Sequence, residues 1–211
     1  MLFVALEHGT GFAAQVSTAA VGGVTAEVAF VITYFALAAR GARWLPSLAV
    51  ATAAFVGVAA AVDAAHASVA PLLVCALVSL VVALRLVPPM RRIAWPQTRW
   101  ELPLRVVLAT SLVLAITGLA AMLGPGISGI ATTYPLITTT LAVFVHRAAG
   151  GRAAIAVYRG LLLGMFALTA FAATVEVALT RVPLAVAFLL AFVLTATAQL
   201  GSLPVVRRAQ A

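Results

Sequence analysis

Twelve of the thirteen arginines fall in four short clusters, and the clusters occur at every second break between strongly apolar segments. Loops on one face of a multi-span membrane protein carry such an excess of basic residues. The chain is also 64% apolar and only 9% charged, which leaves too little polar surface to cover a water-soluble globule. The sequence therefore predicts an all-α membrane protein.

The position of the arginines also indicates which partners the net charge of +8 favours. A nucleic-acid-binding protein presents its basic residues on a solvated face, whereas these arginines are confined to the ends of apolar segments. Basic juxtamembrane loops set the orientation of a protein and attract anionic headgroups. We expect membrane lipids, and no nucleic acid, as partners of these residues.

The apolar segments approach the roughly 20 residues that cross a bilayer, and nine of the ten prolines lie at segment edges, where a helix tolerates them. This pattern predicts about eight transmembrane helices. The predicted spans are 2–20, 24–39, 46–63, 68–87, 103–124, 128–146, 153–179 and 183–203.

The predicted spans place all four clusters on one face, which the positive-inside rule makes cytoplasmic, with both termini on that side. The location that we expect is the bacterial cytoplasmic (inner) membrane. The clusters are Arg40 and Arg43; Arg85, Arg91, Arg92, Arg99 and Arg105; Arg147, Arg152 and Arg159; and Arg207 and Arg208. The tryptophans lie beside them, as headgroup-level indoles do: Trp44, Trp95 and Trp100.

The longest polar loop divides the chain into halves with matching span counts. We predict a first four-span repeat at 1–88, a cytoplasmic linker at 89–102 and a second four-span repeat at 103–211. The motif Gly22-Gly23-Val24 aligns with Ser128-Gly129-Ile130 at the start of the second span of each half. An even number of spans per repeat predicts two parallel repeats, related by an axis along the membrane normal.

Acidic residues inside spans cost about 3 kcal/mol each on insertion scales, so each needs a reason. Glu27 lies one turn into the second span, opposite the Thr132–Tyr134 stretch of the other half in the repeat alignment. Asp63 and Glu176 occupy roughly equivalent positions near the outer ends of their spans, which suggests a polar chamber open to the outside. The alternative is that these two lie at the headgroup level, where side chains can reach water.

The sixth predicted span contains the one interior proline, Pro135. Proline removes a backbone hydrogen bond, and broken helices of this kind form substrate sites in many transporters. The alternative is a kink whose free carbonyls bond to nearby Ser and Thr hydroxyls. We predict a substrate or proton path formed by Glu27, Tyr34, Thr132, Thr133, Tyr134, Pro135, Glu176 and Asp63.

Two further features are a basic pair at the end of the sixth span and a glycine motif in the seventh. His146 and Arg147, at the inner end of the sixth span, could recognise an anionic headgroup or phosphate, or could act only as a positive-inside anchor. Gly160 and Gly164 form a GxxxG motif that allows close helix packing. No nucleotide, metal or catalytic motif is present, so we expect no cofactor and no metal, and the sequence leaves open whether the protein is an enzyme.

The run Gly129 to Pro135 (GIATTYP), the following His146, and Arg159 to Leu168 (RGLLLGMFAL) together resemble the GlpM-type family of small bacterial inner-membrane proteins. Members of that family are single units of about four spans, so the resemblance, mainly over 128–176, implies two fused units here. The family is linked to alginate exopolysaccharide production. The resemblance implies an envelope-related role and supplies no catalytic residues.

Three functions are consistent with these features. The first is a small transporter or translocator of an envelope-related, lipid-linked or small-molecule substrate, with Glu27 binding protons or cations. The second is a non-catalytic membrane subunit that supports an envelope or polysaccharide assembly system through a membrane protein partner. The third is an intramembrane enzyme acting on an isoprenoid or lipid, although the paired aspartate-rich motifs that hold diphosphate are missing.

Overall fold

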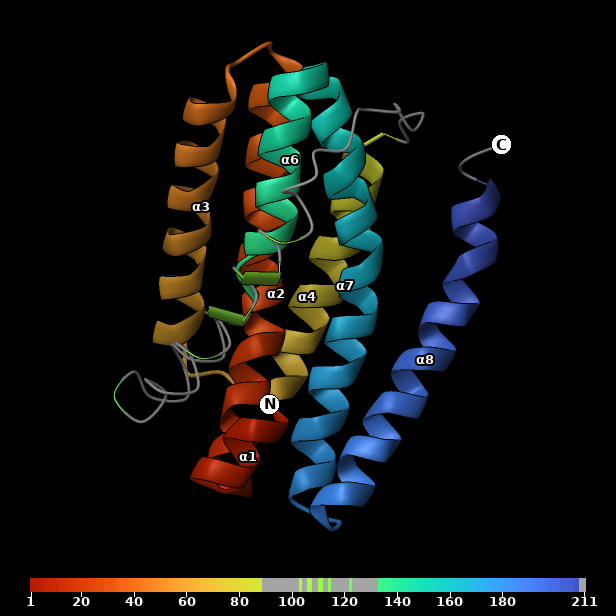
Figure 1. Cartoon of the computed structure of the whole chain (residues 1–211). Coiled ribbons are helices and arrows are strands. Elements are labelled where there is room, and N and C mark those ends of the chain that lie inside the picture. Colours follow the sequence, from red (N-terminus) through yellow and green to blue (C-terminus); the bar gives the residue numbers. More distant parts are fainter. Residues whose placement is uncertain are drawn as a thin grey trace.

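The computed structural model describes residues 1–88 and 133–208, together with seven isolated positions between these two ranges. Within the described ranges all regular structure is helical, and the helices lie side by side along one direction (Figure 1). The helices are α1 (Leu2–His8), α2 (Thr10–Ala39), α3 (Trp44–Ala64), α4 (Val69–Leu86), α6 (Leu136–Ala149), α7 (Gly151–Leu179) and α8 (Leu184–Arg208).

Four of these helices, α2, α3, α4 and α7, are long and apolar enough to cross a membrane. The shortest, α4, has 18 residues and therefore extends about 27 Å, close to the thickness of a hydrocarbon core. Large apolar side chains are exposed on the outward faces of the bundle, for example Val56 on α3, Val74 on α4 and Phe192 on α8. Such faces fit a lipid environment.

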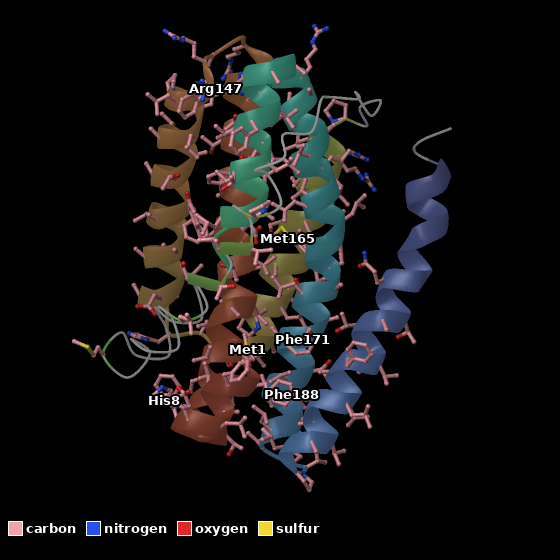
Figure 2. All side chains as sticks on the ribbon, in the orientation of Figure 1. Met1, His8, Arg147, Met165, Phe171 and Phe188 are labelled. Carbon is pink, nitrogen blue, oxygen red and sulfur yellow. The ribbon has the colours of Figure 1, made fainter. Side chains whose placement is uncertain are left out.

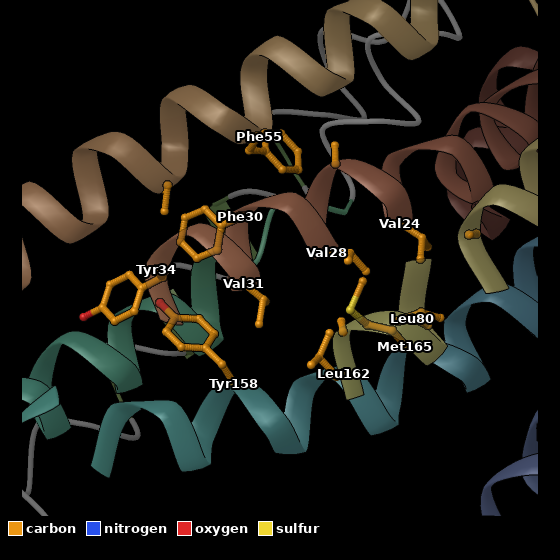
Figure 3. Packing of buried hydrophobic residues seen from close by; sticks show 14 of the residues in the cluster. Val24, Val28, Phe30, Val31, Tyr34, Phe55, Leu80, Tyr158, Leu162 and Met165 are labelled. Carbon is orange, nitrogen blue, oxygen red and sulfur yellow. The ribbon is translucent and has the colours of Figure 1, made fainter. Parts of the chain in front are cut away.

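The centre of the bundle is formed by α2 and α7, which pack against each other and against α4. Aromatic and aliphatic side chains of α2, α3, α4 and α7 meet there, with Phe30 and Tyr34 of α2 facing Tyr158 of α7 (Figure 3). A smaller apolar cluster joins α1 and the start of α2 to the end of α7 and the start of α8. In it the rings of Phe171 and Phe188 lie 6.1 Å apart (Figure 2).

The first two predicted spans, 2–20 and 24–39, are wrong as separate segments. Residues Thr10–Ala39 form one continuous helix, and Gly22 and Gly23 lie within it. Glycine weakens a helix in water, but backbone groups in lipid have no other hydrogen-bond partners, so the helix continues. The glycines instead allow close packing, because a Cβ on Gly22 would overlap Val62 and one on Gly23 would overlap Thr133.

The N-terminal segment is a short hairpin, and it does not cross the bundle. Helix α1 has seven residues, about 10 Å, and turns into α2 at Gly9, whose φ of 87° favours glycine. Met1 consequently lies beside Ser17, whose Oγ donates a hydrogen bond to the Met1 Sδ at 2.8 Å. The start of the chain is therefore in the half of the bundle away from the arginine clusters, whereas the sequence predicts it beside them.

Several helices after α2 agree with the predicted spans. Predicted spans 46–63, 68–87 and 153–179 correspond to α3, α4 and α7, and 183–203 to most of α8. The predicted span 103–124 and the linker 89–102 fall almost wholly outside the described residues. Since one helix, α2, replaces the first two predicted spans, the set of eight spans is not confirmed, and the internal repeat stays a prediction.

The described arginine clusters lie at one end of the bundle, which we call the arginine-rich end. The α2–α3 and α6–α7 connections and the end of α8 all lie there, and the α7–α8 turn with Arg181 lies at the opposite end (Figure 1). One arginine also has a structural role: the Arg159 guanidinium donates to the backbone carbonyls of Leu84 and Val87. A cation at this position stabilises the C-terminal end of α4.

A matched pair of glycines tests the packing of α2. Gly23→Ala is expected to destabilise the protein by about 1–3 kcal/mol, since three atoms of Thr133 obstruct the new methyl group and a rotamer change cannot clear them all. Gly57→Ala, at an open position of α3, is expected to be neutral or to stabilise by up to about 1 kcal/mol. Thermal unfolding in detergent measures both, and equal effects would contradict the close approach at Gly23.

Candidate functional site

One face of α2 carries the residues on which the site is built. Gly23, Glu27, Phe30 and Tyr34 are separated by four, three and four positions, so they form a single stripe along the helix. All of them are buried or, for Gly23, packed directly against another segment. At Gly23 the stripe packs against the segment just before α6. At Phe30 and Tyr34 it packs against side chains of this segment, of α6 and of α7.

Helix α6 begins inside the bundle. It starts at Leu136, directly after Pro135, and its 14 residues extend only about 21 Å. Figure 1 shows this start part-way along α2, with α6 ending at the arginine-rich end. The first turn is closed by the Leu136 amide bonding to the Tyr134 carbonyl at 2.7 Å and the Thr139 amide bonding to the Pro135 carbonyl at 2.7 Å. A helix N-terminus, with its partial positive charge, therefore lies within the apolar bundle.

Glu27 lies next to this helix start. Its neighbours on the stripe are Gly23, which packs on Thr133, and Phe30, whose ring meets that of Tyr134 at 6.0 Å. The side chain is only 2% exposed, and no ion-pair or hydrogen-bond partner for it lies within the described part of the chain. A buried, ionised carboxylate without a partner is energetically unfavourable. The carboxyl group of Glu27 is therefore suited to hold a proton or to bind a cation.

All three tyrosines of the chain gather around Phe30, although they come from three different parts of the sequence. The Phe30 ring lies 6.3 Å from Tyr34, 6.0 Å from Tyr134 and 5.7 Å from Tyr158, and the last two contacts are edge-to-face. Figure 3 shows Phe30 with Tyr34 and Tyr158. Edge-to-face pairs each add about 0.5–1.5 kcal/mol beyond the area that they bury. We call Phe30 with the three tyrosines the tyrosine cluster.

Two hydroxyl groups of the tyrosine cluster make side-chain hydrogen bonds. Tyr34 Oη lies 2.7 Å from His146 Nδ1, which ties the end of α2 to the end of α6. Tyr134 Oη lies 3.1 Å from Thr52 Oγ1 and so ties the start of α6 to α3. These bonds hold one end of α6 against α2 and the other against α3.

The third hydroxyl of the cluster is different. Tyr158 Oη is buried and has no hydrogen-bond partner among the described residues, and the same is true of Thr139 Oγ1. The two side chains are neighbours but miss hydrogen-bond geometry. Buried polar groups are rarely left unpaired, so this position suits a water molecule or a polar group of a ligand.

The two kinds of hydroxyl give opposite predictions. Tyr34→Phe is expected to destabilise the protein by about 1 kcal/mol, since it removes the bond to His146. Tyr158→Phe is expected to be neutral or stabilising by about 1 kcal/mol, since it removes an unpaired buried group. Unfolding midpoints of the two purified variants test the contrast; a larger loss for Tyr158→Phe would mean that its hydroxyl has a partner.

Open clefts lie at the two ends of the bundle. At the end opposite the arginines, a cleft of about 350 Å³ is lined by the polar residues Gln15, Thr18, Asp63 and His66 and by apolar residues that include Val62 and Leu72. Val62 and Leu72 also pack against Gly22, so these two side chains lie both at the cleft and against α2. At the arginine-rich end, a second cleft of about 450 Å³ reaches His146.

The residues of the predicted path are only partly brought together. Thr133, Tyr134 and Pro135 lie at the start of α6, facing the stripe of α2 that carries Glu27 and Tyr34. Asp63 is exposed in its own cleft, and neither Glu27 nor the half-buried Glu176 is among the residues that line that cleft. Thr132 is outside the described residues.

Three members of the site are absent from the sequence prediction: Phe30, Tyr158 and the His146 side chain as a partner of Tyr34. The spacing from Gly23 to Tyr34 already places Phe30 on the stripe of Glu27, so this residue could have been found from helical periodicity. Tyr158 could not, because nothing in the local sequence indicates that α7 turns this residue toward α2.

The helices and their apolar outer surfaces define the class: this is a multi-pass helical membrane protein with polar residues inside the bundle. Comparisons of the chain with protein-family models, with curated proteins and with solved structures gave no match.

Proposed function

We propose that this protein is a small membrane transporter and that Glu27 is its proton- or cation-binding group. The observation that carries the proposal is the burial of Glu27, 2% exposed and without a partner among the described residues, beside the start of a helix that begins within the bundle. Intramembrane carboxyl groups are rare and mark ion or substrate pathways. Half-helices whose ends point at a central site are a recurrent element of transporters.

The clefts at the two ends support the same proposal. Transport by alternating access requires a central group that each side of the membrane reaches in turn. Glu27 lies on α2 between the Asp63 cleft and the His146 cleft, and Tyr34 of the same stripe contacts His146. In this proposal the apolar pair Val62 and Leu72 closes one side, and the tyrosine cluster closes the other.

The proposal is tested with purified protein in liposomes that contain a pH-sensitive dye. A potassium diffusion potential, set with valinomycin, drives protons inward, and the measurement is repeated with sodium, potassium and phosphate gradients. We expect dye responses above those of empty liposomes in at least one condition. Responses equal to empty liposomes in every condition would contradict proton-linked transport.

A second candidate, a non-catalytic membrane subunit, is favoured by a separate observation. A Cβ on Gly160 or Gly164 of the GxxxG motif would meet no described atom within 4 Å. Such a face permits close approach of another helix, from a partner or from the part of the chain outside the described ranges. The resemblance to the GlpM-type family of the bacterial inner membrane agrees with an envelope-related role in either case.

The two candidates differ in which substitution matters. If the protein is a subunit, Gly160→Leu together with Gly164→Leu should release the partner that co-purifies with it, and Glu27→Gln should not. If it is a transporter, Glu27→Gln should remove activity in liposomes, where no partner is present. Retained activity of the Glu27→Gln variant together with loss of a partner from the glycine variant would favour the subunit.

A further inference from the structure

We propose that the cleft at the arginine-rich end binds a phosphate-bearing anion. The cleft lies where two connections meet, α2–α3 and α6–α7; Arg43 belongs to the first connection, and Arg147 lies in the last turn of α6, just before the second. Its volume of about 450 Å³ is ample for a phosphate group and the first atoms attached to it. This proposal is independent of transport, because it concerns a different position in the bundle.

The charge of the cleft is positive and uncompensated within the described structure. Among the residues that the structure describes, no carboxylate lines it. The four described acids lie elsewhere: Glu7 in α1, Glu27 in the middle of α2, Asp63 at the opposite end and Glu176 near the opposite end of α7. Two guanidinium groups at the edge of one cleft therefore have no counter-ion there among the described residues, and arginine suits the geometry of phosphate oxygens.

Arg147 is held in position by an aromatic ring. Its guanidinium carbon lies 5.8 Å from the centre of the ring of Trp44, which is the first residue of α3 and also lines the cleft. A cation over an indole face gains about 0.5–1 kcal/mol at an exposed site, and it keeps its N–H groups free at the edges for a further partner. The contact thus orients the arginine without neutralising it. Figure 2 shows Arg147 at this end of the bundle.

The backbone at the start of α7 adds partial positive charge to the cleft. Helix α7 begins at Gly151, which lines the cleft with Gly150. The first amide groups of a helix have no acceptor within it and favour an anion. Gly151 also packs directly on Ala38, so the start of α7 is close to the end of α2. The arginines, and secondarily this helix start, converge on the space between the two connections.

A phosphate in this cleft has two sources, the headgroup of an anionic lipid or a free phosphate compound, and the experiment separates them. Purified protein in neutral maltoside detergent is titrated with inorganic phosphate at constant ionic strength, and separately with short-chain phosphatidic acid. Diacylglycerol with the same chains is the phosphate-free control. Binding is measured as the rise of the thermal unfolding midpoint and by native mass spectrometry of retained ligand.

We expect phosphatidic acid or inorganic phosphate to bind and diacylglycerol not to bind. Arg43→Gln and Arg147→Gln should each weaken binding by about tenfold, the value of one charge-assisted hydrogen bond. Arg40→Gln removes the same charge at the same end, but Arg40 does not line the cleft, so this control should change affinity less than about twofold.

The outcomes are distinct. Binding of phosphatidic acid alone indicates a lipid headgroup site, and binding of inorganic phosphate indicates a site for soluble phosphate compounds; both support the proposal. Equal weakening by Arg40→Gln and Arg147→Gln would overturn it, since the attraction would then be that of a general basic surface. Absence of binding by either phosphate probe to the wild-type protein would also overturn it. The single variants are compared only if their unfolding midpoints without ligand match the wild type.

Discussion

Glu27→Gln is expected to reduce transport in liposomes to the level of empty vesicles while leaving the protein folded. Glutamine has nearly the shape of glutamic acid, so the packing of the stripe against Thr133 and Tyr134 is retained. It cannot release a proton or neutralise a cation. The substitution also removes a buried acid that has no partner in the described structure, so the free energy of unfolding should stay equal or rise by about 1 kcal/mol.

Glu176→Gln is the matched control, because Glu176 is also an acid in a long apolar helix but is only half-buried. It should retain most of the activity of the wild type. Glu27→Asp should retain part of the activity, since the acid is present on a shorter side chain. Full activity of Glu27→Gln, or equal loss from both glutamine variants, would contradict the role assigned to Glu27.

Phe30→Ala is expected to cause the largest loss of stability, about 3–5 kcal/mol. The side chain is fully buried and contacts all three tyrosines, so its removal leaves a cavity between α2, α6 and α7. In a membrane this loss is mainly one of van der Waals packing, because lipid is as apolar as the protein interior. The thermal unfolding midpoint in detergent measures the effect, and Phe30→Leu should recover more than half of it.

Phe192→Ala provides the control for this loss. Phe192 is 68% exposed on α8 and faces the surroundings of the bundle, so the same change there should cost less than about 0.5 kcal/mol. A similar midpoint for the two alanine variants would mean that the tyrosine cluster is not packed as described.

The sequence predicts the class and the positions of α3, α4, α7 and α8 well, for a clear physical reason. Long apolar runs and arginine clusters report directly on the bilayer, which limits segment length and orientation. The prediction fails at Gly22 and Gly23, which it places between two separate spans although they lie within one helix. Satisfaction of backbone hydrogen bonds and close packing against Val62 and Thr133 decide that position, and both are tertiary effects.

The candidate site is predictable only in part for a related reason. A carboxyl group in an apolar run marks Glu27, and a proline within a span marks the start of α6. The convergence of Tyr34, Tyr134 and Tyr158 depends on how α2 and α7 are rotated about their axes and on where the segment before α6 lies, and the apolar periodicity of the sequence does not specify it. The cleft between Arg43 and Arg147 likewise depends on two connections more than a hundred residues apart in the chain.

The most direct test of the account is the water accessibility of Thr133, which is 3% exposed and packs on Gly23 one turn from Glu27. Thr133→Cys is prepared in a Cys75→Ala background; Cys75 is exposed on α4, so its replacement leaves the packing intact. A small membrane-impermeant thiol reagent is applied to intact cells and to inside-out vesicles. Ala65→Cys, in an exposed turn, serves as the reactive reference, and Ala76→Cys, fully buried on α4, as the dry reference. We expect position 133 to be labelled more slowly than position 65 and faster than position 76, and we expect Glu27→Gln to change this rate. Labelling as slow as at position 76 from both sides would contradict a water-accessible path to Glu27.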